Sequence, residues 1–266
     1  MTIPVALTIA GSDSSGGAGI QADLKSFAAL GVYGASVITA LTAQNTQGVT
    51  GVHAVPPDFV TAQIDAVFGD LDVAAVKIGM VAQPATIDAI AAGLERWSPK
   101  HVVLDPVMVA TSGDRLLATD AVAALRTKLI PRAALLTPNL PEAAALLDEP
   151  IATSEDAIAD QGQRLLAMGC QAVLIKGGHG PGAQSIDYLF GGNGTVALAA
   201  PRIVTQNTHG TGCSLSSAIA AELAKGEDME TAVRHAKVWI SVAIAAADRL
   251  KVGHGHGPIH HFHRFY

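Results

Sequence analysis

The sequence predicts an α/β fold in which a mostly parallel, mixed sheet lies between two layers of helices. Short apolar runs rich in β-branched residues alternate with longer alanine-rich runs of helical period, the pattern of a parallel sheet covered on both faces. The chain has 266 residues, of which 49% are hydrophobic, so it can bury a substantial core. It contains no fixed-period repeat and no Pro/Ser-rich linker, and we expect one domain over residues 1–266.

The expected elements alternate along the chain. Strands are predicted at Val5–Ile9, Ser36–Ala43, Val73–Ile78, His101–Leu104, Ala133–Leu136 and Ala172–Ile175. Helices are predicted at Ala18–Leu30, Asp58–Phe68, Pro84–Trp97, Thr119–Leu129, Leu140–Leu147, Ser154–Met168, Thr211–Lys225 and Met229–Leu250. Two further strands, Ser185–Phe190 and Gly194–Leu198, are separated by Gly191-Gly192-Asn193, which predicts a hairpin and an antiparallel part of the sheet.

Charge and cysteine content narrow the class of protein. A net charge of -6 with only 15% charged residues leaves no basic surface that could neutralise nucleic-acid phosphates. Cys170 and Cys213 lie far apart in a chain large enough to need no disulfide, which favours free thiols in a reducing compartment. The first residues lack the features of a signal peptide, and the most apolar late run, Val238–Ala247, is too short for a membrane span of roughly 20 residues. We therefore expect a cytoplasmic protein with no nucleic-acid or membrane partner.

A glycine-rich segment, AGSDSSGGAGIQADLK, follows the first strand and opens the first helix, where backbone N–H groups can bind an anion. It is not a P-loop, because Gly17-Ala18 replaces the Lys-Ser/Thr pair. Residues 17–22 fit a dinucleotide-binding pattern, but no acidic residue follows about 20 positions later. A turn alone would not need the polar cluster of this segment, for which we expect substrate contacts: Ser12, Asp13, Ser14, Ser15 and Asp23.

A second glycine-rich turn, Gly210-Thr211-Gly212-Cys213, runs directly into an amphipathic helix. The unpaired N–H groups of such a turn suit the negative charge that develops on a transferring phosphoryl group. A helix N-terminus lowers the pKa of a thiol, so Cys213 is expected to hold a thiolate that accepts a proton from a substrate hydroxyl. The alternative for Cys213 is a buried, inert cysteine.

With these segments, the chain resembles the hydroxymethylpyrimidine/phosphomethylpyrimidine kinases, the thiamin-pathway members of the ribokinase-like superfamily. The resemblance runs nearly end to end through AGSDSSGGAGIQADLK, TALTAQNT, KIGM, DPVMVATSG, LTPNLPEA, LIKGGH and NTHGTGCS. It implies a ribokinase-like three-layer α/β/α fold, Mg-ATP as the phosphoryl donor, and a homodimer. It also implies two successive phosphorylations of 4-amino-5-hydroxymethyl-2-methylpyrimidine, first to the monophosphate and then to the diphosphate.

The resemblance assigns roles at the substrate end. Most ribokinase-like sugar kinases carry G-A-G-D with aspartate as the base, and cysteine in its place is typical of the pyrimidine kinases. Cys213 would then be the base, and the anion hole would be formed by Gly210, Thr211 and Gly212. Gln44 is similar to the family's pyrimidine-binding glutamine, whose amide can pair with an amino group and an adjacent ring nitrogen.

Four more residues would line the same pocket according to the resemblance: Gly11, Asp23, Met80 and Val107. For Met80 and Val107, ordinary core packing is the alternative.

Strand ends supply the nucleotide side. Asp105 ends an apolar strand before Pro106, so its carboxylate should face the crevice and could hold Mg2+ through water. Asn139 and Glu142 match the N-x-x-E pattern of the superfamily, although a helix capping box would explain the same spacing. Lys176 follows a strand and could reach ATP phosphates, the alternative being an exposed lysine.

The histidine-rich tail, residues 254–263, has spacings that allow a zinc site. No cysteine lies nearby, and similar Gly/His tails occur in the family, so we expect a structural or pocket-closing role.

Three other functions stay open. A pyridoxal kinase would act on a similar hydroxymethyl group, although Gln44 argues mildly against it. A catalytically silent ligand-binding or sensor protein is opposed by the four intact polar residues Asp105, Glu142, Lys176 and Cys213. A dehydrogenase is opposed by the missing ribose-binding acid.

Overall fold

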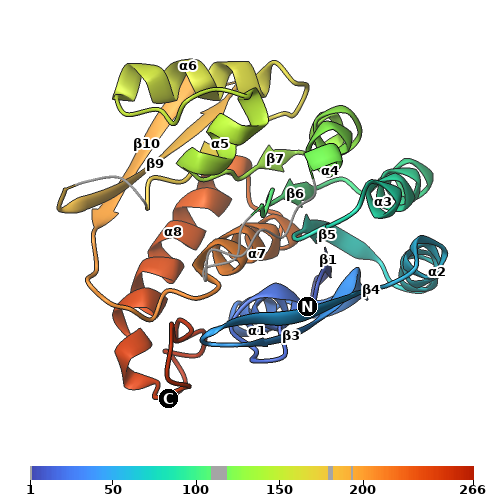
Figure 1. Ribbon diagram of the computed structural model, residues 1–266, viewed down its shortest axis with the longest axis horizontal. Helices are drawn as coiled ribbons and strands as arrows, with labels where there is room; N and C mark the ends of the chain where they lie inside the picture. Colours follow the sequence, from blue (N-terminus) through green and yellow to red (C-terminus); the bar gives the residue numbers. More distant parts are fainter. Residues whose placement is uncertain (1, 109–118, 179–181, 193) are drawn as a thin grey trace.

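The central sheet of the protein has eight strands in the part of the chain that the computed structural model describes, residues 2–108, 119–178, 182–192 and 194–266 (Figure 1). Its order is β10-β9-β8-β7-β6-β5-β1-β2. The strands are β1 (Val5–Ala10), β2 (Tyr33–Ile38), β5 (Val73–Ile78), β6 (Val102–Leu104), β7 (Leu135–Leu136), β8 (Val173–Ile175), β9 (Gln184–Gly191) and β10 (Gly194–Pro201). From β8 to β2 the neighbours are parallel, and β9 and β10 are antiparallel. The prediction of a mostly parallel, mixed sheet is confirmed.

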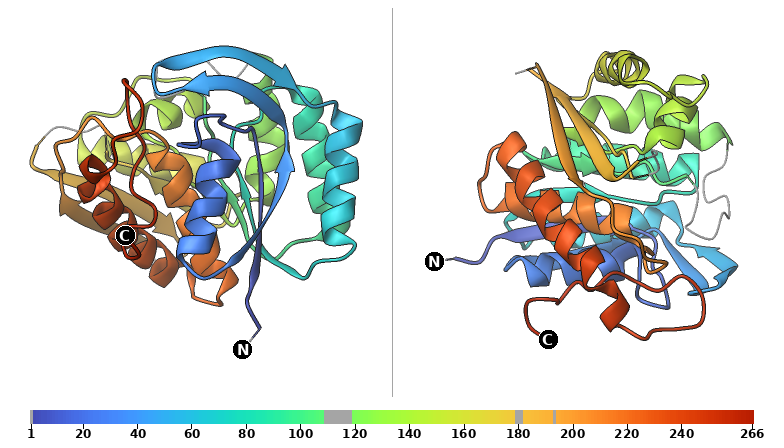
Figure 2. Two further views of the ribbon diagram at one scale, coloured as in Figure 1. Left: turned by 90° about the horizontal axis from the view of Figure 1, so that it is seen from below. Right: turned by 90° about the vertical axis from the view of Figure 1, so that its left-hand side faces the viewer.

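Helices cover both faces of this sheet (Figures 1 and 2). One layer holds α1 (Gly19–Ala29), α7 (Thr211–Ala224) and α8 (Met229–Ala245). The other layer holds α2 (Pro57–Phe68), α3 (Pro84–Trp97), α4 (Thr119–Ala124), α5 (Leu140–Leu147) and α6 (Glu155–Leu166).

Alternation along the central strands builds a separate core on each face. Leu7 and Val76 pack in the core beneath α2 to α6, whereas their neighbours Ala6 and Ala75 pack in the core beneath α1, α7 and α8. Successive side chains of a strand point to opposite faces, so a strand buried on both faces must be apolar throughout. This explains the continuous apolar runs of the sequence.

The prediction of one strand at Ser36–Ala43 is wrong. The chain leaves the main sheet at Thr39, and residues Ala40–Asn45 form β3, which pairs with β4 (Gly48–Ala54) in a separate two-stranded sheet. Thr39 is held at this departure point by its N–H, which donates to Ala10 O at 3.0 Å. The sequence did not predict β4, because most of its residues are exposed and two are glycine, so the apolar run of a buried strand is missing.

Two helix ends also differ from the prediction. The segment predicted as one helix at Thr119–Leu129 is α4 followed by a π-helical turn at Leu125–Leu129. The last helix ends at Ala245 and is followed by a 3-10 turn at Ala247–Arg249. None of the described helices is both long and apolar enough to cross a membrane.

The predicted hairpin is present as β9 and β10, paired in antiparallel register from Gly191 and Gly194 onward. Asn193 of the predicted turn lies outside the described residues. The same holds for residues 109–113 of the DPVMVATSG segment and for His179 of LIKGGH.

Gly162 allows α6 to lie directly on the sheet, which generates a stability prediction. A Cβ atom at this position would lie 2.3 Å from the ring of Phe190, a fully buried residue of β9. We expect Gly162→Ala to lower the free energy of unfolding by about 1–3 kcal/mol through overpacking, although alanine favours a helix. Urea unfolding measures the effect. Gln163→Ala on the exposed face of α6 is the control, and an equal or higher stability for Gly162→Ala would contradict this packing.

Candidate functional site

A cavity of about 750 Å³ opens at the carboxyl ends of the parallel strands. Its wall includes residues that directly follow these strands, among them Gly11 after β1, Asp105 after β6 and Lys176 after β8. Gln44 of β3 lies in its wall as well, and so does Ile240 of α8. The cavity therefore lies where open α/β sheets bind ligands, as the strand-end polar residues predicted.

The turn at the start of α7 is held in a conformation that requires glycine. Gly210 has a φ of 76°, and a Cβ atom there would lie 1.9 Å from the carbonyl oxygen of Gly17. This close approach joins the two glycine-rich segments of the sequence, which are almost two hundred residues apart. The turn thus lines the cavity beside the first glycine-rich loop.

One N–H group of the predicted anion hole is already hydrogen-bonded within the protein. The N–H and hydroxyl of Thr211 both donate to Thr208 O, at 3.2 and 2.7 Å, so the Thr211 N–H is not available to a ligand. The N–H groups of Gly212 and Cys213 have no partner among the described residues, as expected for a first helical turn. Gly212 and Cys213 therefore offer N–H donors to a ligand, whereas the predicted donor Thr211 does not.

Lys176 is the centre of a charge cluster on the cavity wall. Its Nζ lies 2.8 Å from Asp105 Oδ1 and 3.7 Å from Glu142 Oε2. Burial acts to lower the pKa of Lys176, but the two carboxylates outweigh it and raise that pKa. The lysine is thus a fixed positive charge next to Gly212, where a Cβ atom would lie 3.3 Å from its Nζ.

Asp105 lines the cavity, as predicted, although only 1% of it is exposed. Its carboxylate also accepts from the hydroxyls of Thr137 at 3.2 Å and Ser216 at 3.3 Å. Burial opposes its ionised form, but Lys176 and Lys77 dominate and lower the pKa of Asp105. Asp105 is therefore an anion at neutral pH.

Asn139 and Glu142 form the capping box of α5 and line the cavity at the same time. Asn139 N donates to Glu142 Oε2 at 2.7 Å, and Glu142 N donates to Asn139 Oδ1 at 2.8 Å. Burial raises the pKa of Glu142 to about 7, with a further contribution from Asp105 that Lys176 opposes. The N-x-x-E spacing of Asn139 and Glu142 is therefore both a helix capping box and a pair of cavity-lining residues.

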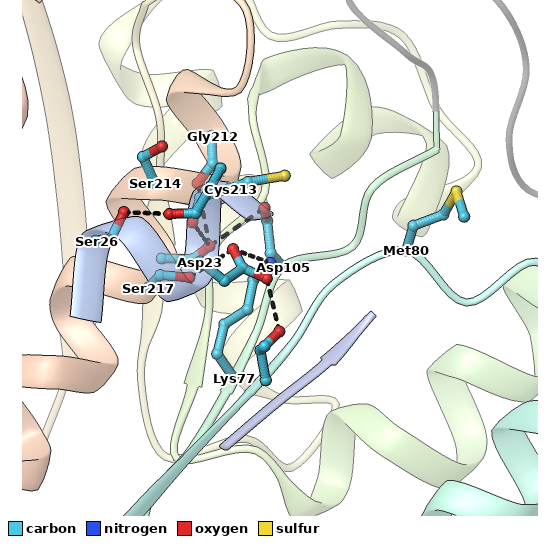
Figure 3. Close-up of polar contacts among 12 residues, drawn as sticks. Asp23, Ser26, Lys77, Met80, Asp105, Gly212, Cys213, Ser214 and Ser217 are labelled. Atoms are coloured by element: carbon cyan, nitrogen blue, oxygen red, sulfur yellow. Dashed lines mark hydrogen bonds and ion pairs between the residues drawn. The ribbon is translucent and has the colours of Figure 1, made fainter. Parts of the chain in front are cut away.

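The floor of the site is a buried ion pair that the sequence analysis missed (Figure 3). Lys77 Nζ lies 2.9 Å from both oxygens of Asp23, and neither side chain is exposed. Asp23 also accepts from Thr8 Oγ1 at 2.6 Å and Ser217 Oγ at 2.7 Å. The expectation that Asp23 lines the pocket is wrong, because Lys77 takes that place and Asp23 lies behind it. A lysine inside an apolar strand was the signal for this pair.

The Cys213 thiol lines the cavity and is half-buried. Burial raises the pKa of this thiol to about 11; Lys77 lowers it, whereas Asp23 and Asp105 raise it further. The expectation of a depressed pKa is therefore wrong, because desolvation and two carboxylates outweigh the helix N-terminus. In the protein without ligand, Cys213 is a neutral thiol at neutral pH.

Four of the residues predicted to contact a ring also line the cavity: Gly11, Gln44, Met80 and Val107. A Cβ atom at Gly11 would lie 2.3 Å from Met80 Cε, so glycine makes room for this methionine. The Gln44 backbone is clamped by Ser14 Oγ, which donates to Gln44 O at 2.7 Å and accepts from Gln44 N at 2.8 Å. The Gln44 amide is thereby presented from β3 to the cavity.

Asp13 organises the first glycine-rich loop. Its carboxylate accepts from the N–H groups of Ser15, Gly17 and Ala18 at 2.8 to 3.1 Å and lies 2.7 Å from His209 Nε2. Burial opposes the charge, but these hydrogen bonds hold the pKa of Asp13 well below its usual range. Of the polar cluster in this loop, Ser12 and Asp13 line the cavity, whereas Ser14 and Ser15 support its wall from behind. His209 was not singled out from the sequence.

The histidine-rich tail packs against the ring end of the cavity. Gly257 O accepts from His209 N at 3.0 Å, and His256 N donates to Thr46 O at 2.9 Å. Further along, His261 Nε2 lies 2.8 Å from Ser214 Oγ, one residue after Cys213. The tail thus connects the turn between β3 and β4, the loop before α7 and α7 itself, which supports the expected structural role.

The tail histidines do not gather around a shared metal position in the described part of the chain. The acidic and histidine side chains that do converge there lie at the junction of α7 and α8: Glu222, Glu227 and His235.

A second ion pair, largely buried, also lines the cavity. Lys237 of α8 lies 2.7 Å from Asp187 Oδ2, and Asp187 Oδ1 accepts from Gly177 N at 2.8 Å. This pair fixes the backbone that directly follows Lys176. The sequence analysis missed both residues, since an aspartate that interrupts an apolar strand was the only local signal.

Comparison with known proteins gives one consistent family. A family model described as "Phosphomethylpyrimidine kinase" matches residues 13–260. The chain is 57% identical over 261 residues to a hydroxymethylpyrimidine/phosphomethylpyrimidine kinase of Escherichia coli, covering 98% of both proteins. It is 60% identical over 262 residues to the protein of the same name from Rhizobium meliloti, again covering 98% of both.

Solved structures of similar proteins share the whole fold. A Bacillus subtilis pyridoxal kinase in complex with ADP has a TM-score of 0.91 at 36% identity, with complete coverage of both chains. A phosphomethylpyrimidine kinase from Clostridium difficile has a TM-score of 0.81 at 45% identity, covering 91% of this chain and 100% of that one. The three-layer fold is therefore the ribokinase-like one, and the chain belongs to the phosphomethylpyrimidine kinase family.

Proposed function

We propose that this kinase transfers the γ-phosphoryl group of ATP to 4-amino-5-hydroxymethyl-2-methylpyrimidine, and then a second one to the resulting monophosphate, in thiamin biosynthesis. The observation that carries the proposal is one cavity with the Gln44 amide on one wall and the Gly210–Cys213 turn on another. An amide can pair with the amino group and ring nitrogen of the pyrimidine, while the turn offers donors to a phosphoryl group. The names of the relatives from E. coli and R. meliloti support the same reaction.

We propose ATP as the donor, because similar pyridoxal kinases are described in complex with ADP and AMP-PCP. The residues present fit a nucleotide with a divalent cation. Lys176 carries a fixed positive charge, and the N–H groups of Gly212 and Cys213 have no protein partner among the described residues. Mg2+ would be held by Asp105 and Glu142 through water and would supply positive charge to the phosphates.

The residues of the chain then act on the reacting atoms directly. Lys176 and the N–H groups of Gly212 and Cys213 stabilise the charge of the γ-phosphoryl group during transfer. The hydroxymethyl oxygen forms a bond to the γ-phosphorus, the bond to the bridging oxygen of ADP breaks, and the hydroxyl proton moves to Sγ of Cys213 in those molecules in which Cys213 is a thiolate. In the second transfer the attacking phosphate oxygen is already anionic, so no base is needed there.

The proposal also covers the domain organisation, the oligomeric state and the cellular location of the enzyme. We propose that residues 1–266 work as one kinase domain and as a homodimer. We also propose that the enzyme acts in the cytoplasm, where both of its cysteines, which form no disulfide in the described chain, stay reduced.

Pyridoxal phosphorylation is the second candidate, favoured by the complete structural overlap with pyridoxal kinases. The two activities differ in the ring edge that Gln44 must recognise. Turnover on each compound at equal ATP concentration separates them.

Product mass tests the proposed function itself. With the hydroxymethylpyrimidine and Mg-ATP, we expect the monophosphate to appear first and the diphosphate to follow, both detected by mass spectrometry. A monophosphate that is never converted further would limit the enzyme to the first step. Efficient turnover of pyridoxal with none of the hydroxymethylpyrimidine would show that the enzyme is a pyridoxal kinase instead.

Cys213→Ala is expected to slow the first transfer by about 100-fold or more and the second by less than about tenfold, because only the first needs a general base.

With a pKa of about 11, the thiolate fraction of Cys213 rises about tenfold per pH unit between pH 7.5 and 9.5. The rate of the first transfer divided by that of the second should therefore rise with pH in the wild type. The titration of Glu142, whose pKa is about 7, should change both rates equally and so cancel in this ratio. Separately supplied substrates measure the two rates. Equal losses in both steps, or a ratio independent of pH, would contradict the base role.

Lys176→Met removes the fixed charge beside Gly212. We expect kcat/KM for both transfers to fall by about 100-fold or more, because the phosphoryl charge loses its cationic partner in each. Steady-state kinetics with either acceptor measure the loss, after circular dichroism has confirmed the fold. Lys128→Met, which breaks an exposed ion pair with Asp88, is the matched control. Loss in one transfer only would argue against a shared phosphate site.

A further inference from the structure

A chain of polar side chains runs along the ring end of the cavity, from Asp13 through His209 and Gln44 to Thr42. His209 Nε2 lies 2.7 Å from Asp13 Oδ2 and 3.5 Å from Gln44 Nε2. At its other side, the Gln44 amide has Oε1 3.2 Å from the Thr42 hydroxyl. All four residues line the cavity, and Asp13, His209 and Thr42 are buried. The positions of their hydrogens therefore decide which atoms of the cavity wall donate a hydrogen bond to a bound ring and which accept one.

Asp13 determines where the His209 hydrogen lies. Its carboxylate accepts from three backbone N–H groups and the Ser15 hydroxyl, and these bonds keep it ionised. A bare ring nitrogen 2.7 Å from this carboxylate would bring two lone pairs together. His209 Nε2 must therefore carry a hydrogen, which it donates to Asp13, and it is this positive N–H that lies 3.5 Å from the Gln44 amide.

The same logic applies at Thr42. Its hydroxyl donates its one hydrogen to Ser12 O at 2.8 Å, so its lone pairs are left for Gln44. An amide with nitrogen towards His209 would place two donors together, and one with oxygen towards Thr42 would share a hydrogen already used. Turning the amide of Gln44 by 180° exchanges its oxygen and nitrogen. The amide oxygen then lies beside the His209 N–H, whose hydrogen it shares with Asp13, and the amide nitrogen donates to a lone pair of the Thr42 hydroxyl.

We propose that His209, held by Asp13, is a positioning residue that fixes the Gln44 amide with its oxygen towards His209 and its nitrogen towards Thr42. This rests on the proposed function and deepens it, because the direction of the amide sets the direction of the substrate.

In the aminopyrimidine, the 4-amino group lies between ring nitrogen N3 and the carbon that carries the hydroxymethyl group. When Gln44 Oε1 accepts from the amino group and Gln44 Nε2 donates to N3, the hydroxymethyl group lies on the Oε1 side. That side faces His209, the residue immediately before Gly210 and the Gly210–Cys213 turn. The amide direction therefore turns the reacting hydroxyl towards the catalytic turn.

The specificity of the enzyme should depend on this arrangement. The 4-oxo analogue, 5-hydroxymethyl-2-methylpyrimidin-4-one, carries an acceptor at position 4 and a hydrogen on N3, so it requires the opposite amide direction. An amide that is free to turn would accept both rings. An amide held by His209 and Thr42 accepts the 4-amino compound and rejects the 4-oxo compound.

The test is the preference of the enzyme for the 4-amino over the 4-oxo compound, measured as the ratio of their kcat/KM values and of their dissociation constants. We expect a ratio of about 100 in the wild type, because the 4-oxo compound could form both hydrogen bonds to Gln44 only if the amide turned round. His209→Leu, without the N–H, should reduce this ratio to about 10 or less. His209→Gln, whose amide N–H can replace the ring N–H, should restore most of it.

Thr42→Val tests the other end of the chain and should lower the same ratio, so it decides the matter if His209→Leu does not fold. The matched controls are His53→Leu and Thr50→Val, both exposed on β4, which should leave the ratio unchanged. A wild-type ratio near one, or an equal loss on both compounds in His209→Leu and Thr42→Val, would overturn the positioning role. Wild-type turnover of the 4-amino compound tests the proposed function separately, and its absence would overturn both.

Discussion

The buried ion pair of Lys77 and Asp23 is the interaction on which the site depends. It joins β5 to α1, and the hydroxyls of Thr8 and Ser217 extend it to β1 and α7. Because Ser217 lies one helical turn after Cys213, the pair sets the position of the first turn of α7 above the sheet (Figure 3). Loss of one partner would leave an uncompensated charge in the core, at a cost of about 3–5 kcal/mol. The Gly210–Cys213 turn is therefore held by electrostatics as well as by packing.

Above this floor, the two glycine-rich segments make one wall. Gly210 approaches the carbonyl of Gly17 so closely that no side chain fits between them, and His209 bonds Asp13 across the same contact. Neither segment is a phosphate loop of a familiar pattern by itself. Together they connect the N–H groups of Gly212 and Cys213 with His209 and Gln44 on the cavity wall. In the proposed reaction, this connection would couple the orientation of the substrate to phosphoryl transfer.

The secondary structure was predicted best where local signals are complete. Pro84–Trp97 and Leu140–Leu147 are helices with the predicted bounds, since a proline in the first turn marks each start and a capping box also marks the second. Val73–Ile78 is a strand with the predicted bounds because it is buried on both faces. The small sheet of β3 and β4 was missed, because its pairing, and not an apolar run, makes these residues strands.

For the site, the sequence by itself determined the family, the location at the strand ends and most of the residues on the cavity wall, because these motifs are contiguous and follow predicted strands. They include Gln44, Asp105, Asn139, Glu142, Lys176 and Cys213. Only the tertiary structure decided that Asp23 lies beneath the cavity, that the Thr211 N–H is already bonded, and that the pKa of Cys213 rises. The reason is physical: burial and charge at Cys213 come from Lys77, Asp23 and Asp105, all more than a hundred residues away along the chain.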